Sequence, residues 1–303
     1  WQFVQSAVVG VVLGLYAFTM PKCPTNSSSE KRSFVEALGL NAFALFKQKK
    51  MALFFIFSIL LGVSLQITNG FANPFISDFG QIAQYADTFG VKHANILISL
   101  SQVSETLCIL LIPFCLKRFG IKKVMLMAMV AWVLRFGLFG LGNPGTGVWM
   151  FLLSMVVYGV AFDFFNVSGA LFVEREASSD IQASAQGLFM LMTNGIGATI
   201  GTLGAQAVIN HFVYNAAEPN WSAAWYVFAA YALVMAILFI IFFKCGIPHC
   251  QQILSFLLFF LFIYINNISI FVVFTFTITK YNIKSIIITC RNDAFFTIFA
   301  HII

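Results

Sequence analysis

Long apolar segments alternate with short polar segments along most of the chain. Seven of these segments are apolar and long enough to be interpreted as membrane helices. A helix rises about 1.5 Å per residue and needs about 20 residues to cross the hydrocarbon core of a bilayer. The pattern therefore predicts helices over residues 2–20, 51–73, 94–116, 124–141, 148–173, 182–209 and 223–243. The predicted fold class is all-α, a polytopic transmembrane helical bundle.

The composition supports a membrane protein and argues against a soluble one. Of the 303 residues, 60% are hydrophobic and 9% are charged, whereas soluble domains have about 25% charged residues. The net charge of +6 does not indicate nucleic-acid binding, because the basic residues lie in short runs between apolar segments. Twelve basic residues lie in linkers on one side of the predicted membrane and only Lys92 lies on the other. This asymmetry places the linker 21–50 and the end of the seventh segment in the cytoplasm.

The first linker and the two ends of the chain differ from the apolar segments. The chain begins at Trp1 inside an apolar run without signal-peptide features, so we expect the end of a helix from a longer protein. Residues 22–32 are rich in Pro, Ser and Lys and are expected to be flexible. An amphipathic surface helix is predicted to follow, because apolar residues recur at helical spacing. They are Phe34, Val35, Leu38, Ala42, Leu45 and Phe46. The tail, 246–303, is rich in Ile, Phe, Asn and Thr, and we expect either a segment foreign to this fold or two additional helices.

Several polar side chains interrupt the predicted membrane helices. A carboxylate at bilayer depth costs roughly 2.5–3.5 kcal/mol on insertion scales, so it needs a partner or a function. Glu105 is such a residue, and Gln102 lies three positions before it on the same helix face. Gln66 and Asn69 have the same spacing in the segment 51–73. These pairs indicate polar surfaces that face the interior of the bundle.

A third group lies in the segment 148–173. Tyr158, Phe162 and Asn166 follow one another at steps of four residues on one face, whereas Asp163 is rotated away from them. Amides and a carboxylate offer hydrogen bonds and aromatic rings offer a stacking surface, which suits a polar, ring-bearing solute with hydroxyl groups. The alternative is that these groups only hydrogen-bond neighbouring helices.

Arg135 and a series of glycines complete the candidate residues. Arg135 lies in the segment 124–141, where it neutralises Glu105 or Asp163 or extends to the nearer membrane surface. Gly197 and Gly201 form a small-xxx-small pattern, which predicts close contact with another helix.

No arrangement of residues indicates catalysis, a metal site or a cofactor. The four histidines are not placed with a Ser or Cys nucleophile. Cys245, His249 and Cys250 are close in sequence, but we expect free thiols there rather than a metal site. No enzyme activity and no cofactor are therefore expected.

Three segments resemble one known family in the same order along the chain. Residues 101–107 (SQVSETL), 114–123 (FCLKRFGIKK) and 158–166 (YGVAFDFFN) are similar to the eighth helix, the next cytoplasmic loop and the tenth helix of the nucleoside:proton symporters, a family of the major facilitator superfamily. Gln66 and Asn69 match the polar pair of the seventh helix of that family. The resemblance covers about residues 1–244.

This resemblance implies a truncated bundle of the major facilitator type, with about seven native membrane helices and alternating access around a central site. Residues 1–20 would end the N-terminal six-helix half, 21–50 would be the cytoplasmic linker between the halves, and 51–244 would form the C-terminal six-helix half. Residues 246–303 would be an atypical tail. The chain alone is then not expected to transport.

The resemblance also implies the roles of the candidate residues and the function. Asp163 would couple protons, and the nucleoside would be bound by Gln66, Asn69, Gln102, Glu105, Tyr158 and Phe162. The implied protein is a secondary active transporter that imports nucleosides with protons across the bacterial inner membrane. Its partners would be the nucleoside, protons and the lipid bilayer. A symporter for sugars or other polar solutes on the same fold and a non-transporting receptor or scaffold are the alternatives.

Overall fold

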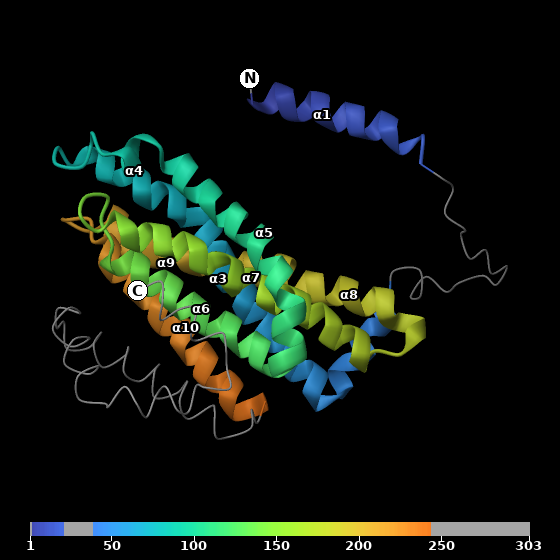
Figure 1. Ribbon diagram of the computed structural model, residues 1–303. Coiled ribbons are helices and arrows are strands. Elements are labelled where there is room, and N and C mark those ends of the chain that lie inside the picture. Colours follow the sequence, from blue (N-terminus) through green and yellow to red (C-terminus); the bar gives the residue numbers. More distant parts are fainter. Residues whose placement is uncertain (1, 21–38, 244–303) are drawn as a thin grey trace. The chain divides into compact units, whose positions relative to one another are not determined.

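The computed structural model describes residues 2–20 and 39–243 (Figure 1). The described residues form helices, turns and loops, with no strand among them. The chain divides into two units between Leu40 and Asn41. The first contains α1 (Gln2–Ala17), a 16-residue apolar helix. The predicted flexible segment 22–32, the start of the amphipathic segment, the proposed free thiols Cys245 and Cys250, and the tail 246–303 lie outside the described residues.

The second unit contains the bundle. Six of its helical segments are long and apolar enough to cross a membrane. Five are single helices: α3 (Lys49–Asp78), α5 (Ala94–Phe119), α6 (Ile121–Leu141), α7 (Val148–Glu176) and α10 (Trp221–Phe243). The sixth combines α8 (Gln182–Met190), the π-helical turn η4 (Leu191–Gly197), α9 (Ala198–Ile209) and the π-helical turn η5 (Asn210–Tyr214). The prediction of an all-α, polytopic helical bundle is confirmed.

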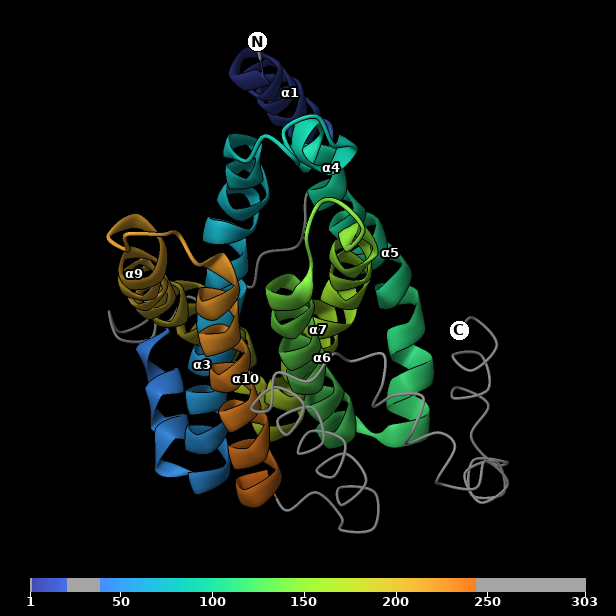
Figure 2. The same cartoon turned by 90° about the vertical axis from the view of Figure 1, so that its left-hand side faces the viewer.

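The long helices pack in a consistent lateral order. α3 contacts α9 and η4 on one side and α10 on the other, α10 contacts α6, α6 contacts α7, and α7 contacts α5. Figure 2 shows α9 and α5 on opposite flanks with the other long helices between them. The aromatic side chains of the inner helices form a continuous core, in which Phe75 of α3 contacts Phe139, Phe151 and Trp225. The short helix α4 (Phe89–Lys92) precedes α5.

The end of α3 differs from its prediction. The predicted segment 51–73 stops before Pro74, but α3 continues through Pro74 to Asp78. A proline inside a helix removes one hydrogen bond and its ring crowds the carbonyl four residues earlier. Here the buried Phe75 and Ile76 hold the continuation of α3 in the core. Burial of the residues after Pro74 therefore outweighs the local effect of the proline.

Two glycines predicted to mediate helix packing do so against α3. A Cβ atom at Gly197 would lie 2.6 Å from the Ile59 carbonyl oxygen, and one at Gly201 would lie 2.9 Å from the Val63 Cα. On α3, a Cβ atom at Gly62 would lie 2.1 Å from the carbonyl oxygen of Thr193 in the π-helical turn η4. The packing interpretation of Gly197 and Gly201 is confirmed, and Gly62 completes the contact from the opposite helix.

This contact makes Gly62→Ala a test of the packing. We expect the substitution to lower the free energy of unfolding by about 2 kcal/mol, because the methyl group would force α3 and η4 apart. The midpoint of thermal unfolding of the detergent-solubilised protein measures the effect. Gly187→Ala in α8 is the matched control, since no atom outside its own helix lies within 4 Å of a Cβ atom there. Equal midpoints for the two variants would contradict the close contact.

The described part of the amphipathic segment is a 3-10 helix, η1 (Leu40–Lys47), rather than an α-helix. Ala42 and Leu45 are buried against the bundle, and the ring of Phe46 lies 5.0 Å from that of Phe55. The expected apolar face is therefore present over these residues.

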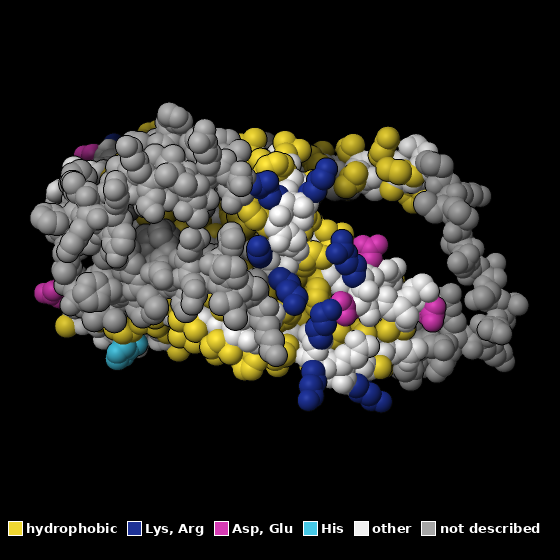
Figure 3. Space-filling model, turned by 60° about the horizontal axis from the view of Figure 1, so that its bottom comes forward, with side chains coloured by type: hydrophobic (Ala, Val, Ile, Leu, Met, Phe, Trp, Pro, Cys, Tyr) yellow, Lys and Arg dark blue, Asp and Glu magenta, His cyan; other side chains and the backbone are white. Residues whose placement is uncertain are grey.

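Basic side chains gather at one end of the bundle (Figure 3). The start of α3, the junction of α5 with α6 and the end of α7 all contribute basic residues there. Lys50 forms an ion pair with Glu176, and the Lys122 Nζ donates a hydrogen bond to the Phe243 carbonyl oxygen at 3.3 Å. The shared end is the arrangement that the charge asymmetry of the linkers predicts for a cytoplasmic face.

Candidate substrate-binding site

A polar cavity of about 350 Å³ lies between α3, α5, α6 and α7. Each of the four helices contributes polar side chains to its wall. The lining residues are Thr68, Asn69, Ala72, Asn73, Ile98, Ser101, Gln102, Glu105, Arg135 and Tyr158. Such a volume lies at the lower end of the range for small-molecule sites, so the cavity accommodates one small solute.

The cavity brings together four of the seven candidate site residues, Asn69, Gln102, Glu105 and Tyr158. The other three do not line it. The Cβ of Gln66 points toward Gly201 of α9, where a Cβ atom would lie 3.0 Å away. Phe162 stacks on Tyr158 with the ring centroids 6.1 Å apart and the ring planes 9° apart. Asp163 is buried in the helix packing beside the cavity.

One cation and one carboxylate give the cavity wall no net formal charge. Arg135 is 1% exposed, so it does not extend to the membrane surface. Its Nε donates to the Thr68 Oγ1 at 3.3 Å, and its Nη1 donates to the Ser154 carbonyl oxygen at 2.7 Å. Among the described residues, the ion pairs involve other groups, so Glu105 has no direct salt bridge to Arg135. The two charges act on each other across the cavity rather than in contact.

The Glu105 carboxylate remains available to a solute. Tyr158 on α7 lines the same cavity, and its hydroxyl interacts with this carboxylate. Gln102 is one turn earlier on α5 and is exposed within the described part of the chain. Above them, the Asn73 Nδ2 donates to the Asn95 Oδ1 at 2.9 Å and links α3 to α5. The carboxylate and the amides can therefore accept hydrogen bonds from hydroxyl or amino groups.

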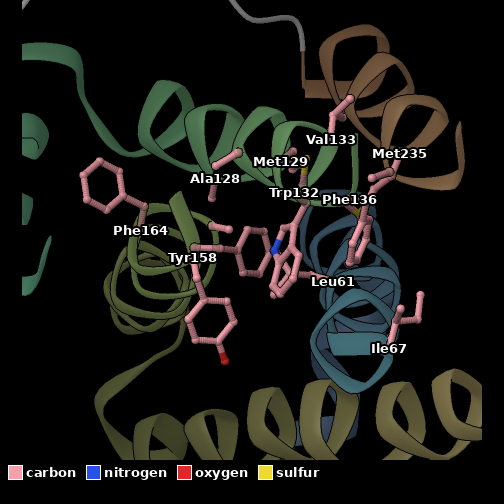
Figure 4. Packing of buried hydrophobic residues seen from close by; sticks show 14 of the residues in the cluster. Leu61, Ile67, Ala128, Met129, Trp132, Val133, Phe136, Tyr158, Phe164 and Met235 are labelled. Carbon is pink, nitrogen blue, oxygen red and sulfur yellow. The ribbon is translucent and has the colours of Figure 1, made fainter. Parts of the chain in front are cut away.

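The Tyr158 ring forms the aromatic wall of the cavity. It meets Trp132 edge to face, with the centroids 5.8 Å apart and the planes 85° apart. In Figure 4 the Tyr158 hydroxyl points away from the Trp132 ring. The Tyr158 ring thus packs in the core on the side of Trp132, and its hydroxyl end lies at the cavity.

Asp163 differs from Glu105 in its surroundings. Its side chain is 5% exposed, and its Oδ2 has no hydrogen-bond partner among the described residues. The carboxylate lies close enough to Glu105 for the two charges to interact. Protonation of the two carboxylates is therefore coupled, because like charges repel in an apolar setting.

A close contact between backbones fixes the distance between α5 and α7. A Cβ atom at Gly159 would lie 2.7 Å from the carbonyl oxygen of Ser104 and 2.8 Å from the Cys108 Sγ. The Ser104 hydroxyl donates to the carbonyl oxygen of Val156 at the same level. Glu105 follows Ser104 and Tyr158 precedes Gly159, so this contact sets the distance between Glu105 and Tyr158.

Sequence reasoning did not identify several residues of the cavity wall. Thr68 and Ser101 are not among the predicted site residues, because short hydroxyl residues are common in membrane helices. Asn73 is the last residue of the predicted segment 51–73 and is not among the predicted site residues. Arg135 was noted as a buried charge, but its partners come from α3 and α7, which the sequence alone does not place beside it.

Comparison with known proteins identifies the family. A family model described as "Nucleoside H+ symporter" matches residues 1–247. The xanthosine permease of Escherichia coli K12 is 52% identical over 244 residues, which cover 80% of this chain and 58% of that protein. The nucleoside permease NupG of the same organism is 48% identical with the same coverage.

A solved structure agrees with these relatives. The crystal structure of the nucleoside transporter NupG matches with a TM-score of 0.68 and 48% identity, over 78% of this chain and 59% of that one. The chain thus spans 58% of the length of the curated relatives named above. The fold is the bundle of major facilitator type expected from the sequence, and the chain belongs to the nucleoside H+ symporter family.

Proposed function

We propose that the protein imports nucleosides together with protons by alternating access in the bacterial inner membrane. In this proposal, residues 51–244 form one six-helix half of the transporter and residues 1–20 belong to the other half. The observation that carries the proposal is the polar cavity, where Asn69, Gln102, Glu105 and Tyr158 converge from three helices.

The charge of the cavity supports an uncharged solute. Within the described part of the chain, Glu105 and Arg135 are the formally charged residues that line it, and their charges cancel. An organic acid would leave Glu105 opposed to a like charge, which is unfavourable in a site of low dielectric constant. Uridine and most other nucleosides are uncharged near neutral pH and carry both hydroxyl groups and an aromatic ring. The amides and Glu105 would bind the hydroxyls or base edges, and Tyr158 with Phe162 behind it would pack against a ring.

Asp163 is the proposed proton-coupling residue. Its side chain is buried, its Oδ2 has no hydrogen-bond partner among the described residues, and the carboxylate interacts with the charge of Glu105. Binding a proton would remove a charge from the bundle interior before the helices rearrange. The proton and the nucleoside would then cross together.

Competition during uptake tests the solute class. We expect cells that express the full-length gene product to accumulate labelled uridine when the outside is acidic, and a proton-conducting ionophore to abolish accumulation. Unlabelled nucleosides should reduce labelled uridine uptake at least tenfold, whereas sugars and organic acids at equal concentration should not.

Cells with the empty vector provide the background. Competition by sugars but not by nucleosides would overturn the proposal in favour of a sugar symporter. Absence of any solute flux would favour a receptor or scaffold.

A further inference from the structure

Arg135 is bound in the wall of the cavity by two other helices. Its guanidinium group donates to Thr68 on α3 and to the Ser154 carbonyl oxygen on α7, while Arg135 itself belongs to α6. The Ser154 hydroxyl in turn donates to the Arg135 carbonyl oxygen at 3.1 Å. The position of the guanidinium is thus fixed from both sides.

The same guanidinium covers two aromatic rings. Its Cζ lies 4.2 Å from the centroid of the Tyr158 ring and 5.0 Å from that of Phe139. Cation–π contacts act within about 6 Å and are stronger where water is excluded. The guanidinium of Arg135 therefore packs on the Tyr158 ring, which also contacts the rings of Trp132 and Phe162.

Helix packing alone does not require a charge at this position. Replacing buried charged groups with apolar groups of similar volume is often neutral or stabilising. A planar guanidinium, unlike an apolar side chain, can donate in two directions and stack on a ring at once. Arg135 makes both hydrogen bonds and the ring contact at once, and these contacts hold the Tyr158 ring beside Glu105.

We propose that Arg135 is a positioning residue for solute recognition, which acts by holding the Tyr158 ring in place against the cavity. This role rests on the proposed function, because it assigns a part in nucleoside binding. It predicts that the contribution of Arg135 to affinity passes through Tyr158 rather than through direct contact with the solute.

A double-mutant cycle tests this route. Isothermal titration calorimetry on the purified full-length gene product gives the Kd for uridine of the wild type, R135K, Tyr158→Leu and the double variant. A lysine keeps the charge but cannot donate to both partners and stack, so we expect R135K to weaken binding about tenfold. In the Tyr158→Leu background the same change should weaken binding less than twofold, because the ring it positions is absent.

The controls separate positioning from folding. Arg175→Lys is the matched substitution at an exposed arginine near the end of α7 and should leave the Kd unchanged. The thermal midpoints of all variants should show that each is folded, and Arg135→Met replaces R135K in the cycle if the lysine variant does not fold. A tenfold loss for R135K in both backgrounds, or no loss in either, would overturn the positioning role. A wild-type protein that neither binds nor imports any nucleoside would overturn the proposed function itself.

Discussion

Asp163→Asn is expected to abolish uphill accumulation of nucleosides while leaving nucleoside binding within about threefold of the wild-type Kd. Asparagine has the shape of the protonated carboxyl but cannot exchange a proton, so transport would lose its dependence on the proton gradient. Asp163 does not line the cavity, and the substitution therefore leaves the solute contacts in place. Uptake by cells at external pH 5.5 and 7.5, together with calorimetric Kd values, measures both effects.

The dependence of uptake on external pH distinguishes a loss of proton coupling from a general loss of folded protein. The wild type should accumulate more at pH 5.5 than at pH 7.5, because a larger inward proton gradient drives uptake. The variant should show equal, downhill uptake at the two values. Asp180→Asn, at an exposed position, should behave like the wild type. Retained accumulation against a gradient by Asp163→Asn would remove Asp163 from the coupling mechanism.

Glu105→Ala is expected to weaken nucleoside binding about 100-fold. Hydrogen bonds to a charged group contribute about 1.5–3 kcal/mol each, and 1.4 kcal/mol corresponds to a tenfold change in Kd. The Glu105 carboxylate has no salt bridge among the described residues and faces the cavity, so its loss removes hydrogen bonds to the solute. Glu105→Gln keeps one acceptor and should weaken binding about tenfold.

Calorimetry with uridine measures these losses, and Glu218→Gln at an exposed position is the control. The graded order of the two Glu105 variants is the informative result. A Kd that is the same for wild type and Glu105→Ala would show that the carboxylate faces the cavity without binding the solute.

The helical segments were predictable because the length of each apolar segment and the charges of the linkers depend only on residues that are close in sequence. Each long helical segment of the bundle contains its predicted segment, and the boundaries differ by a few residues. The larger differences have tertiary causes. α3 passes Pro74 because Phe75 is buried among rings from three other helices, and the π-helical turn η4 lies where the Thr193 carbonyl meets Gly62. The helix preferences of neighbouring residues do not predict these contacts, because the contacts join residues that are far apart in sequence.

The candidate site was predictable to the extent that its residues are unusual for a membrane helix. Glu105, Gln102 and Asn69 interrupt apolar segments, and Tyr158 lies on the same helix face as Phe162. Helical spacing placed Gln66 with Asn69, but the contact of α3 with α9 turns the Cβ of Gln66 toward Gly201. The partners of Arg135 come from two helices that are distant in sequence, so only the packed structure reveals them.

The residue at position 159 sets the width of the cavity although it does not face the solute. It does not line the cavity, yet any side chain there would press on the Ser104 backbone and move α5 away from α7. The space between Glu105 and Tyr158 would widen without a change in any group that faces the solute. Engineering toward bulkier solutes can therefore begin at a helix contact and leave the recognition chemistry intact.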